Sequence, residues 1–137
     1  MALTGTPLFS QPNLAAIQLI ASGARTTKGS VLFSVFKEGK GYPDKPEMAY
    51  VKGRAAINKE GIAVFEIDSL PAGSYAVALL HDENGDNRMN FSGLGLPKEG
   101  YGFSNNVMGL FGPPALSKAS VSLRAGERKI VRITLRY

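Results

Sequence analysis

The sequence predicts an all-β protein, an antiparallel β-sandwich of about seven strands. Apolar residues alternate with polar ones in short segments, which is the period of a half-buried strand. Turn-forming residues separate these segments every eight to twelve residues or so, as in a sandwich. Almost no segment has the 3.6-residue period of a helix. The length of 137 residues fits one domain, so we expect a single domain over 1–137, with 1–12 as an N-terminal tail.

The first three expected strands differ in how clearly the pattern defines them. The apolar segment 14–21 ends at a Ser-Gly step, and 31–36 is rich in the β-branched and aromatic residues that strands favour. In 51–57 the apolar side chains fall on one face and the basic side chains on the other. A charged segment that contains Gly and Pro, 37–48, connects the second and third strands.

The later strands are bounded by turn sequences. Asn58-Lys59-Glu60-Gly61 predicts a hairpin turn before the strand 62–67, and a Pro-Gly turn precedes 75–80. A last hairpin joins 120–123 to 129–137. The clearest alternation of the chain lies in this final segment, whose apolar face we expect in the core: Val131, Ile133, Leu135 and Tyr137 alternate with Arg132, Thr134 and Arg136.

Composition excludes several classes of protein. The chain has no cysteine, so it has neither disulfides nor thiolate metal sites. Its apolar runs of about six to eight residues are well short of the roughly 20 that a spanning helix needs, so we do not expect a transmembrane protein. The first residues lack the basic and apolar regions of a signal peptide. A net charge of +5 favours encounters with anionic partners without specifying one.

The stretch 82–118 shows no strand or helix pattern and is the expected functional part. Loops longer than about 12 to 15 residues are usually functional or disordered. This one holds many aromatic and aliphatic residues, which argues against disorder. We therefore expect one long ordered loop that packs on the sandwich.

The start of this loop has the spacing of a calcium site. Asp82, Asn84 and Asp86 stand at positions 1, 3 and 5 of an EF-hand-like loop, with the Arg88 carbonyl at 7 and Asn90 at 9. Two positions depart from that pattern, because Asn87 replaces the glycine at 6 and Gly93 replaces the bidentate glutamate at 12. The alternative is a turn at the end of a strand, which uses the same residue types. A calcium site here would be of the weak class, with a Kd of about 0.1 to 1 mM.

Other residues of the loop suggest an interaction surface. Tyr101 and Phe103 could contact a carbohydrate or peptide, with hydrogen bonds from Asn105 and Asn106; the alternative is that the aromatic rings form the loop's own small core. Glu83 and Glu99 belong to the same predicted surface, and they are also the one carboxylate pair that could serve a hydrolase.

Two further patterns have a structural explanation that we favour over a functional one. His81, the single histidine, more simply caps the end of a strand than acts in catalysis. A basic stripe could form on one sheet face, but no aromatic residues are interleaved for stacking, so we do not expect a nucleic-acid partner. The stripe would consist of Lys52, Arg54, Arg132 and Arg136.

Four motifs in order give the chain a family resemblance. These are LPAGSYAV at 70–77, HDENGD at 81–86, EGYGFSNN at 99–106 and FGPP at 111–114. The chain resembles the bacterial exported proteins grouped as domain of unknown function 2141. This resemblance implies an immunoglobulin-like or transthyretin-like sandwich and a periplasmic or secreted location, with a signal peptide trimmed from this sequence. It implies no established activity.

Two functional hypotheses remain. The first is a non-catalytic exported module that binds a protein or carbohydrate of the cell envelope, with the loop at 82–90 ordered by calcium and no other cofactor. The second is an enzyme that acts on envelope carbohydrate or peptide through the loop carboxylates. We favour the first, because no set of residues in the sequence defines a reaction.

Overall fold

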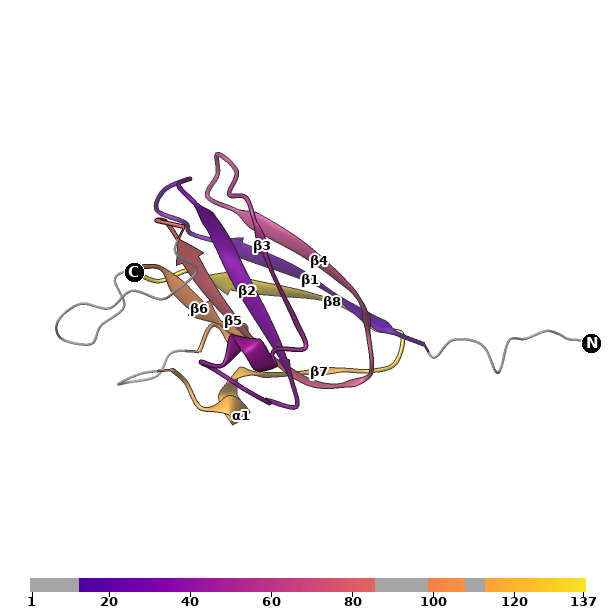
Figure 1. Ribbon diagram of the computed structural model, residues 1–137. Coiled ribbons are helices and arrows are strands. Elements are labelled where there is room, and N and C mark those ends of the chain that lie inside the picture. The colour runs from indigo at the N-terminus through magenta and orange to yellow at the C-terminus, as the bar shows by residue number, and fades with distance from the viewer. Residues whose placement is uncertain (1–12, 86–98, 108–112) are drawn as a thin grey trace, which may run out of the picture.

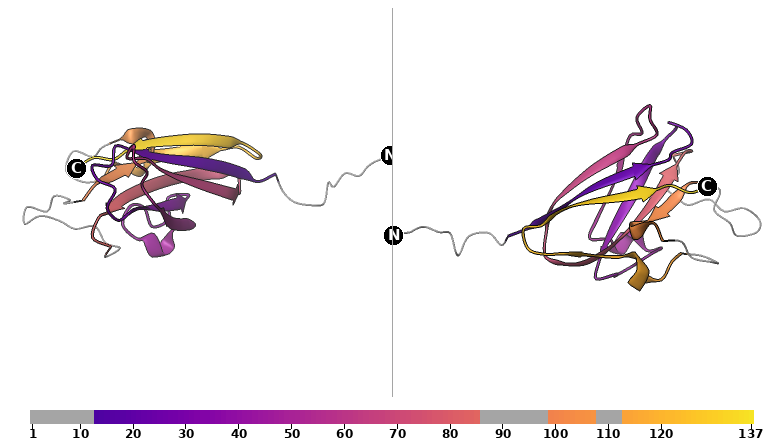
Figure 2. Two further views of the ribbon diagram at one scale, coloured as in Figure 1. Left: turned by 90° about the horizontal axis from the view of Figure 1, so that it is seen from above. Right: turned by 180° about the vertical axis from the view of Figure 1, so that it is seen from behind.

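The computed structural model describes residues 13–85, 99–107 and 113–137, which form two sheets (Figure 1). The three-stranded sheet has the order β4-β1-β8, from β4 (Ala63–Leu70), β1 (Ala15–Ser22) and β8 (Arg128–Thr134). The five-stranded sheet has the order β3-β2-β5-β6, and β7 also pairs with β5. Its strands are β3 (Val51–Ala55), β2 (Ser30–Lys37), β5 (Gly73–Asp82), β6 (Tyr101–Phe103) and β7 (Ser120–Leu123). This sheet faces the viewer in Figure 1, and the three-stranded sheet does so in the rear view of Figure 2.

The hydrophobic core lies between the two sheets. Every second residue of β1, β2, β4, β5 and β8 contributes to it, which is why these strands alternate in sequence. Phe33 on β2 meets Phe65 on β4 across the core, with ring centroids 4.1 Å apart. Each large apolar side chain buried in this way stabilises the fold by about 1.5–3 kcal/mol. The predicted all-β sandwich is therefore confirmed.

One strand pair differs from the predicted antiparallel arrangement. Strands β1 and β8 run parallel in continuous register from Ala16–Arg128 to Ser22–Thr134, while the other strand pairs of the described residues are antiparallel. Alternation in a sequence determines which face of a strand is buried, but it does not determine the direction of the neighbouring strand. The predicted antiparallel sandwich therefore contains one parallel pair.

The stretch 82–118 contains regular structure that the sequence pattern did not indicate. Strand β5 extends to Asp82, and the 3-10 helix η2 (Ser104–Asn106) follows β6 directly. The short helix α1 (Leu116–Ala119) then leads into β7. Elements of three or four residues are too short to show a period, and here hydrogen bonds to distant residues support them. The buried Ser104 hydroxyl accepts from the Val77 N–H at 3.0 Å and donates to the Ala119 carbonyl oxygen.

The basic residues that could have formed one stripe do not share one sheet. Lys52 and Arg54 belong to β3, an edge strand of the five-stranded sheet, whereas Arg132 belongs to β8 of the other sheet. Lys52 and Arg54 therefore cannot share one stripe with Arg132. Strand positions in the sequence do not reveal which sheet a strand joins. A second 3-10 helix, η1 (Pro46–Met48), lies in the connection before β3. No helix of the described residues is long and apolar enough to cross a membrane.

Candidate functional site

Polar and charged side chains gather where β5 ends, and His81 lies at the centre of this strand-end cluster. Its imidazole is fully buried. Its Nε2 lies 2.8 Å from the Lys28 carbonyl oxygen, and its Nδ1 lies 2.6 Å from the Tyr137 hydroxyl. A carbonyl oxygen only accepts, so we assign the hydrogen to Nε2 and let the tyrosine hydroxyl donate to Nδ1. Both ring nitrogens are thus used in holding three chain segments together, which supports a structural role for His81.

Arg25 and Glu83 form the exposed side of the strand-end cluster. The guanidinium donates to both carboxylate oxygens of Glu83, at 2.6 Å and 3.3 Å, and the Thr26 hydroxyl donates to the same carboxylate at 2.8 Å. The hydrogen bond from Arg25 is the main reason that the pKa of Glu83 falls from 4.5 to about 2. The same guanidinium lies 4.6 Å from the centroid of the Tyr137 ring, within cation–π distance.

Tyr137 connects the two sides of the strand-end cluster. Its hydroxyl accepts from the Arg25 backbone N–H at 3.1 Å while it donates to His81. Partial burial raises the pKa of the Tyr137 phenol. The phenol therefore stays protonated at neutral pH, which the hydrogen bond to the imidazole requires.

Glu99 and Gly100 attach the far end of the long connection to β5. The nearly buried carboxylate of Glu99 accepts from the Glu83 backbone N–H at 3.0 Å, and the Gly100 carbonyl accepts from the His81 N–H at 2.8 Å. A Cβ on Gly100 would lie 2.4 Å from the Tyr137 ring, so only glycine allows this approach. Glu83 and Glu99, 16 residues apart in the chain, are thus held together at the end of β5.

The five predicted calcium ligands are described only in part. Asp82 is the last residue of β5 and is fully buried, whereas Asn84 is exposed. Asp86, Arg88 and Asn90 lie outside the described residues. Within 13–85, 99–107 and 113–137, no group of three or more acidic, histidine or cysteine side chains could hold a metal ion. The calcium site stays a prediction.

The residues predicted as an interaction surface are divided between two places. Glu83 and Glu99 lie in the strand-end cluster, as described above. Phe103 is buried, and its ring meets those of Tyr101 and Tyr42 edge to face, with centroids 6.1 Å apart in both cases. This packing fits the alternative of a small core, to which Tyr42 contributes from outside the loop. Whether Tyr101 contributes to binding stays a prediction.

Asn105 and Asn106 lie beside the edges of β7 and β8. The Asn105 amide donates to the Lys118 and Ser120 carbonyl oxygens, each at 3.0 Å. The Asn106 amide oxygen accepts from the Thr134 N–H of β8 at 2.8 Å. Both asparagines have a positive φ, which Asn tolerates better than most residues. Their amides thus bind the edge of one strand from each sheet.

Sequence reasoning missed Arg25 and Tyr137, which hold the cluster together. Arg25 is 58 residues from Glu83 and 112 residues from Tyr137 in the chain. No local spacing connects residues so far apart. The one available signal was the aromatic position at the end of the alternating segment 129–137, which predicted a core role for Tyr137 instead.

One of three comparisons with known proteins places the chain in a family. A search of the curated proteins and a search of the solved structures gave no match. A family model described as "uncharacterized protein conserved in bacteria" matches residues 20–131, a range that includes β2 to β7, the end of β1, the beginning of β8 and the Arg25–Glu83 pair. The chain therefore belongs to this bacterial family, DUF2141, as the sequence motifs indicated.

Proposed function

We propose that this protein is a non-catalytic binding or structural module of the bacterial cell envelope, located in the periplasm or outside the cell. The main support is the way in which the acidic groups of the strand-end cluster are used. Glu83 binds Arg25 and Thr26, and Glu99 holds the Glu83 N–H. These groups build a fixed base for the connection between Glu83 and Glu99. A connection on a rigid scaffold is a common place for binding residues.

The electrostatics of Glu83 give less support to the alternative, an enzyme with paired carboxylates. A glycoside hydrolase needs one carboxylic acid that keeps its proton near neutral pH, which requires a raised pKa. The pKa of Glu83 moves in the opposite direction, to about 2, because Arg25 stabilises its charged form. Glu83 would therefore be a poor proton donor. The acid of such a pair would then have to be Glu99, whose buried carboxylate already accepts the Glu83 backbone N–H.

Calcium is a second part of the proposal. The ion would bind through oxygens of Asp82, Asn84, Asp86 and Asn90 and through the Arg88 carbonyl. The support for it is their alternate spacing in the sequence, which suits a hard cation. Bound calcium would order the segment that follows β5.

Purified bacterial cell-wall sacculi provide the direct test. We expect the protein to co-sediment with sacculi, or with an envelope protein cross-linked to them, without release of reducing sugar or free amino groups. The Glu83→Gln variant should differ from the wild type in thermal stability. The supernatant of the sacculi should again contain no released reducing sugar or free amino groups. Product release by the wild type that disappears in Glu83→Gln would instead establish the enzyme, and no retention on any envelope fraction would contradict the module.

A further inference from the structure

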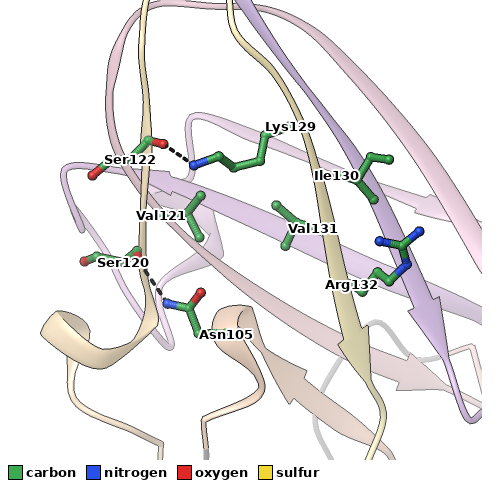
Figure 3. Close-up of a pocket in the computed structure, with 8 residues that line it drawn as sticks. All are labelled: Asn105, Ser120, Val121, Ser122, Lys129, Ile130, Val131 and Arg132. Atoms are coloured by element: carbon green, nitrogen blue, oxygen red, sulfur yellow. Dashed lines mark hydrogen bonds between the residues drawn. The ribbon is translucent and has the colours of Figure 1, made fainter.

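A short groove lies between the free edges of β7 and β8, away from the strand-end cluster. Val121 and Val131 face each other across it (Figure 3). Lys129 crosses one end, where its ammonium donates to the Ser122 carbonyl oxygen at 2.7 Å, and Asn105 closes the other. The groove has a volume of about 260 Å³. This is below the 300 Å³ or so at which pockets for small molecules begin, so a small-molecule ligand is not favoured.

The backbone of β8 presents hydrogen-bonding groups to this groove. The Leu135 N–H donates to Ser22 of β1, whereas the Thr134 N–H donates to Asn106 on the opposite side. N–H and C=O groups of one strand alternate between its two edges, so Ile130 and Arg132 direct theirs away from β1. Among the described residues, β8 itself has no strand partner on this edge, and strand pairing resumes only beyond its end, where Arg136 forms a bridge with Tyr101.

The edge of β7 that faces the groove has fewer unused hydrogen-bonding groups than the edge of β8. Its outward carbonyl groups, those of Ser120 and Ser122, accept hydrogen bonds from Asn105 and Lys129. An added strand would therefore pair with β8. Asn106 ends the available edge at Thr134, which leaves room for about five residues at a strand rise of 3.3 Å per residue.

Charge discriminates between possible partners for this edge. Most of the charged residues in the segment 118–132, which includes this edge, are basic. They are Lys118, Arg124, Arg128, Lys129 and Arg132, and Glu127 is the single acid among them. A second copy paired antiparallel about Ile130 would place Arg128 opposite Arg132, and like charges in facing positions destabilise a strand pair. An acidic strand would instead be attracted, in keeping with the net charge of +5.

We propose that the groove binds an extended acidic peptide segment of another protein, which adds to β8 as a fourth strand of the three-stranded sheet. Main-chain hydrogen bonds to Ile130 and Arg132 would provide affinity, and the arginine side chains would select acidic sequences. This inference rests on the proposed binding role, to which it gives a site and a class of partner. It does not require calcium or the strand-end cluster.

The test uses a fluorescein-labelled hexapeptide of alternating glutamate and valine, with lysine replacing glutamate in the control peptide. We expect saturable binding of the acidic peptide in fluorescence anisotropy and no binding of the basic one. In the wild-type protein, the amide resonances of Ile130 and Arg132 should shift on titration. Arg132→Glu should weaken binding about tenfold by reversing the local charge.

A proline variant tests the backbone pairing. Ile130→Pro removes the outward N–H and should weaken binding about tenfold or more, while an edge strand tolerates the change. Val64→Pro on β4 is the matched control. Val64 is 46% exposed against 50% for Ile130, and its backbone also points away from β1, at the opposite edge of the same sheet. This control should bind the peptide like the wild type.

The outcomes separate this inference from the proposed function. No saturable binding at about 1 mM acidic peptide, or equal losses for Ile130→Pro and Val64→Pro, would overturn the groove proposal. If envelope binding persists in Arg132→Glu while the peptide fails to bind the wild type, the module proposal stands and the groove proposal fails. Should Ile130→Pro not fold, the Arg132→Glu affinity and the amide shifts of the wild type decide the question.

Discussion

The Arg25–Glu83 pair should make the free energy of unfolding depend on pH between about 4.5 and 2. The pKa of Glu83 falls from 4.5 to about 2 on folding, so its charged form favours the folded state. At 1.36 kcal/mol for each pH unit, that difference corresponds to about 3 kcal/mol. The Arg25 side chain is 49% exposed, however, and solvent screens such a pair. We therefore expect about 1–2 kcal/mol, present above pH 4.5 and lost as the pH falls towards 2.

Glu83→Gln isolates this contribution, because glutamine has the same shape and no charge. Urea unfolding at pH 7 should show the variant less stable by about 1–2 kcal/mol, and the difference should shrink between pH 4.5 and 2.5. Glu66→Gln is the control, since Glu66 is exposed and bonds to the neutral Gln18. A difference at pH 7 that stays constant down to pH 2.5, or none at pH 7, would refute the electrostatic argument.

Three further changes test other parts of the structure. Gly100→Ala forces a methyl group into the Tyr137 ring and should lower the free energy of unfolding by about 1–3 kcal/mol in urea titrations; an unchanged midpoint would contradict the close approach. Ser104→Ala leaves the buried Val77 N–H without its hydroxyl acceptor and should cost about 1–3 kcal/mol, whereas rapid amide exchange of Val77 already in the wild type would argue against that bond. Calcium titrated by calorimetry should bind with a Kd of about 0.1–1 mM and more weakly to Asp82→Ala; no heat at about 10 mM would exclude the site.

The sequence predicted the parts of the fold that rest on local alternation. In β4, residues Ala63, Phe65 and Ile67 are buried and the residues between them are exposed, so the buried face is visible in the sequence. β6 has three residues, and its place is set by pairing with β5 at Leu80 and Tyr101. No pattern of three residues can indicate such a partner. The parallel direction of β8 was hidden for the same reason, because it depends on a strand elsewhere in the chain.

The candidate site was predicted in location but not in composition. His81, Asp82 and Glu83 drew attention because polar residues follow an apolar strand directly. Their partners Arg25 and Tyr137 come from distant segments that the fold brings to the end of β5. Residues 70–106 carry three of the four family motifs, and these identified the family without revealing a single contact of the cluster.

The parallel pairing of β1 with β8 also bears on the order of folding. Strand β1 is central in its sheet, yet one of its two neighbours is β8, which most of the chain separates from it. Contacts between distant segments carry a high loop-closure entropy and slow the folding of β proteins. As the chain folds, β1 can pair early with β4, but its second edge stays uncovered until the distant β8 docks. The partly folded chain thus exposes the edge of an apolar strand, which a chaperone could recognise.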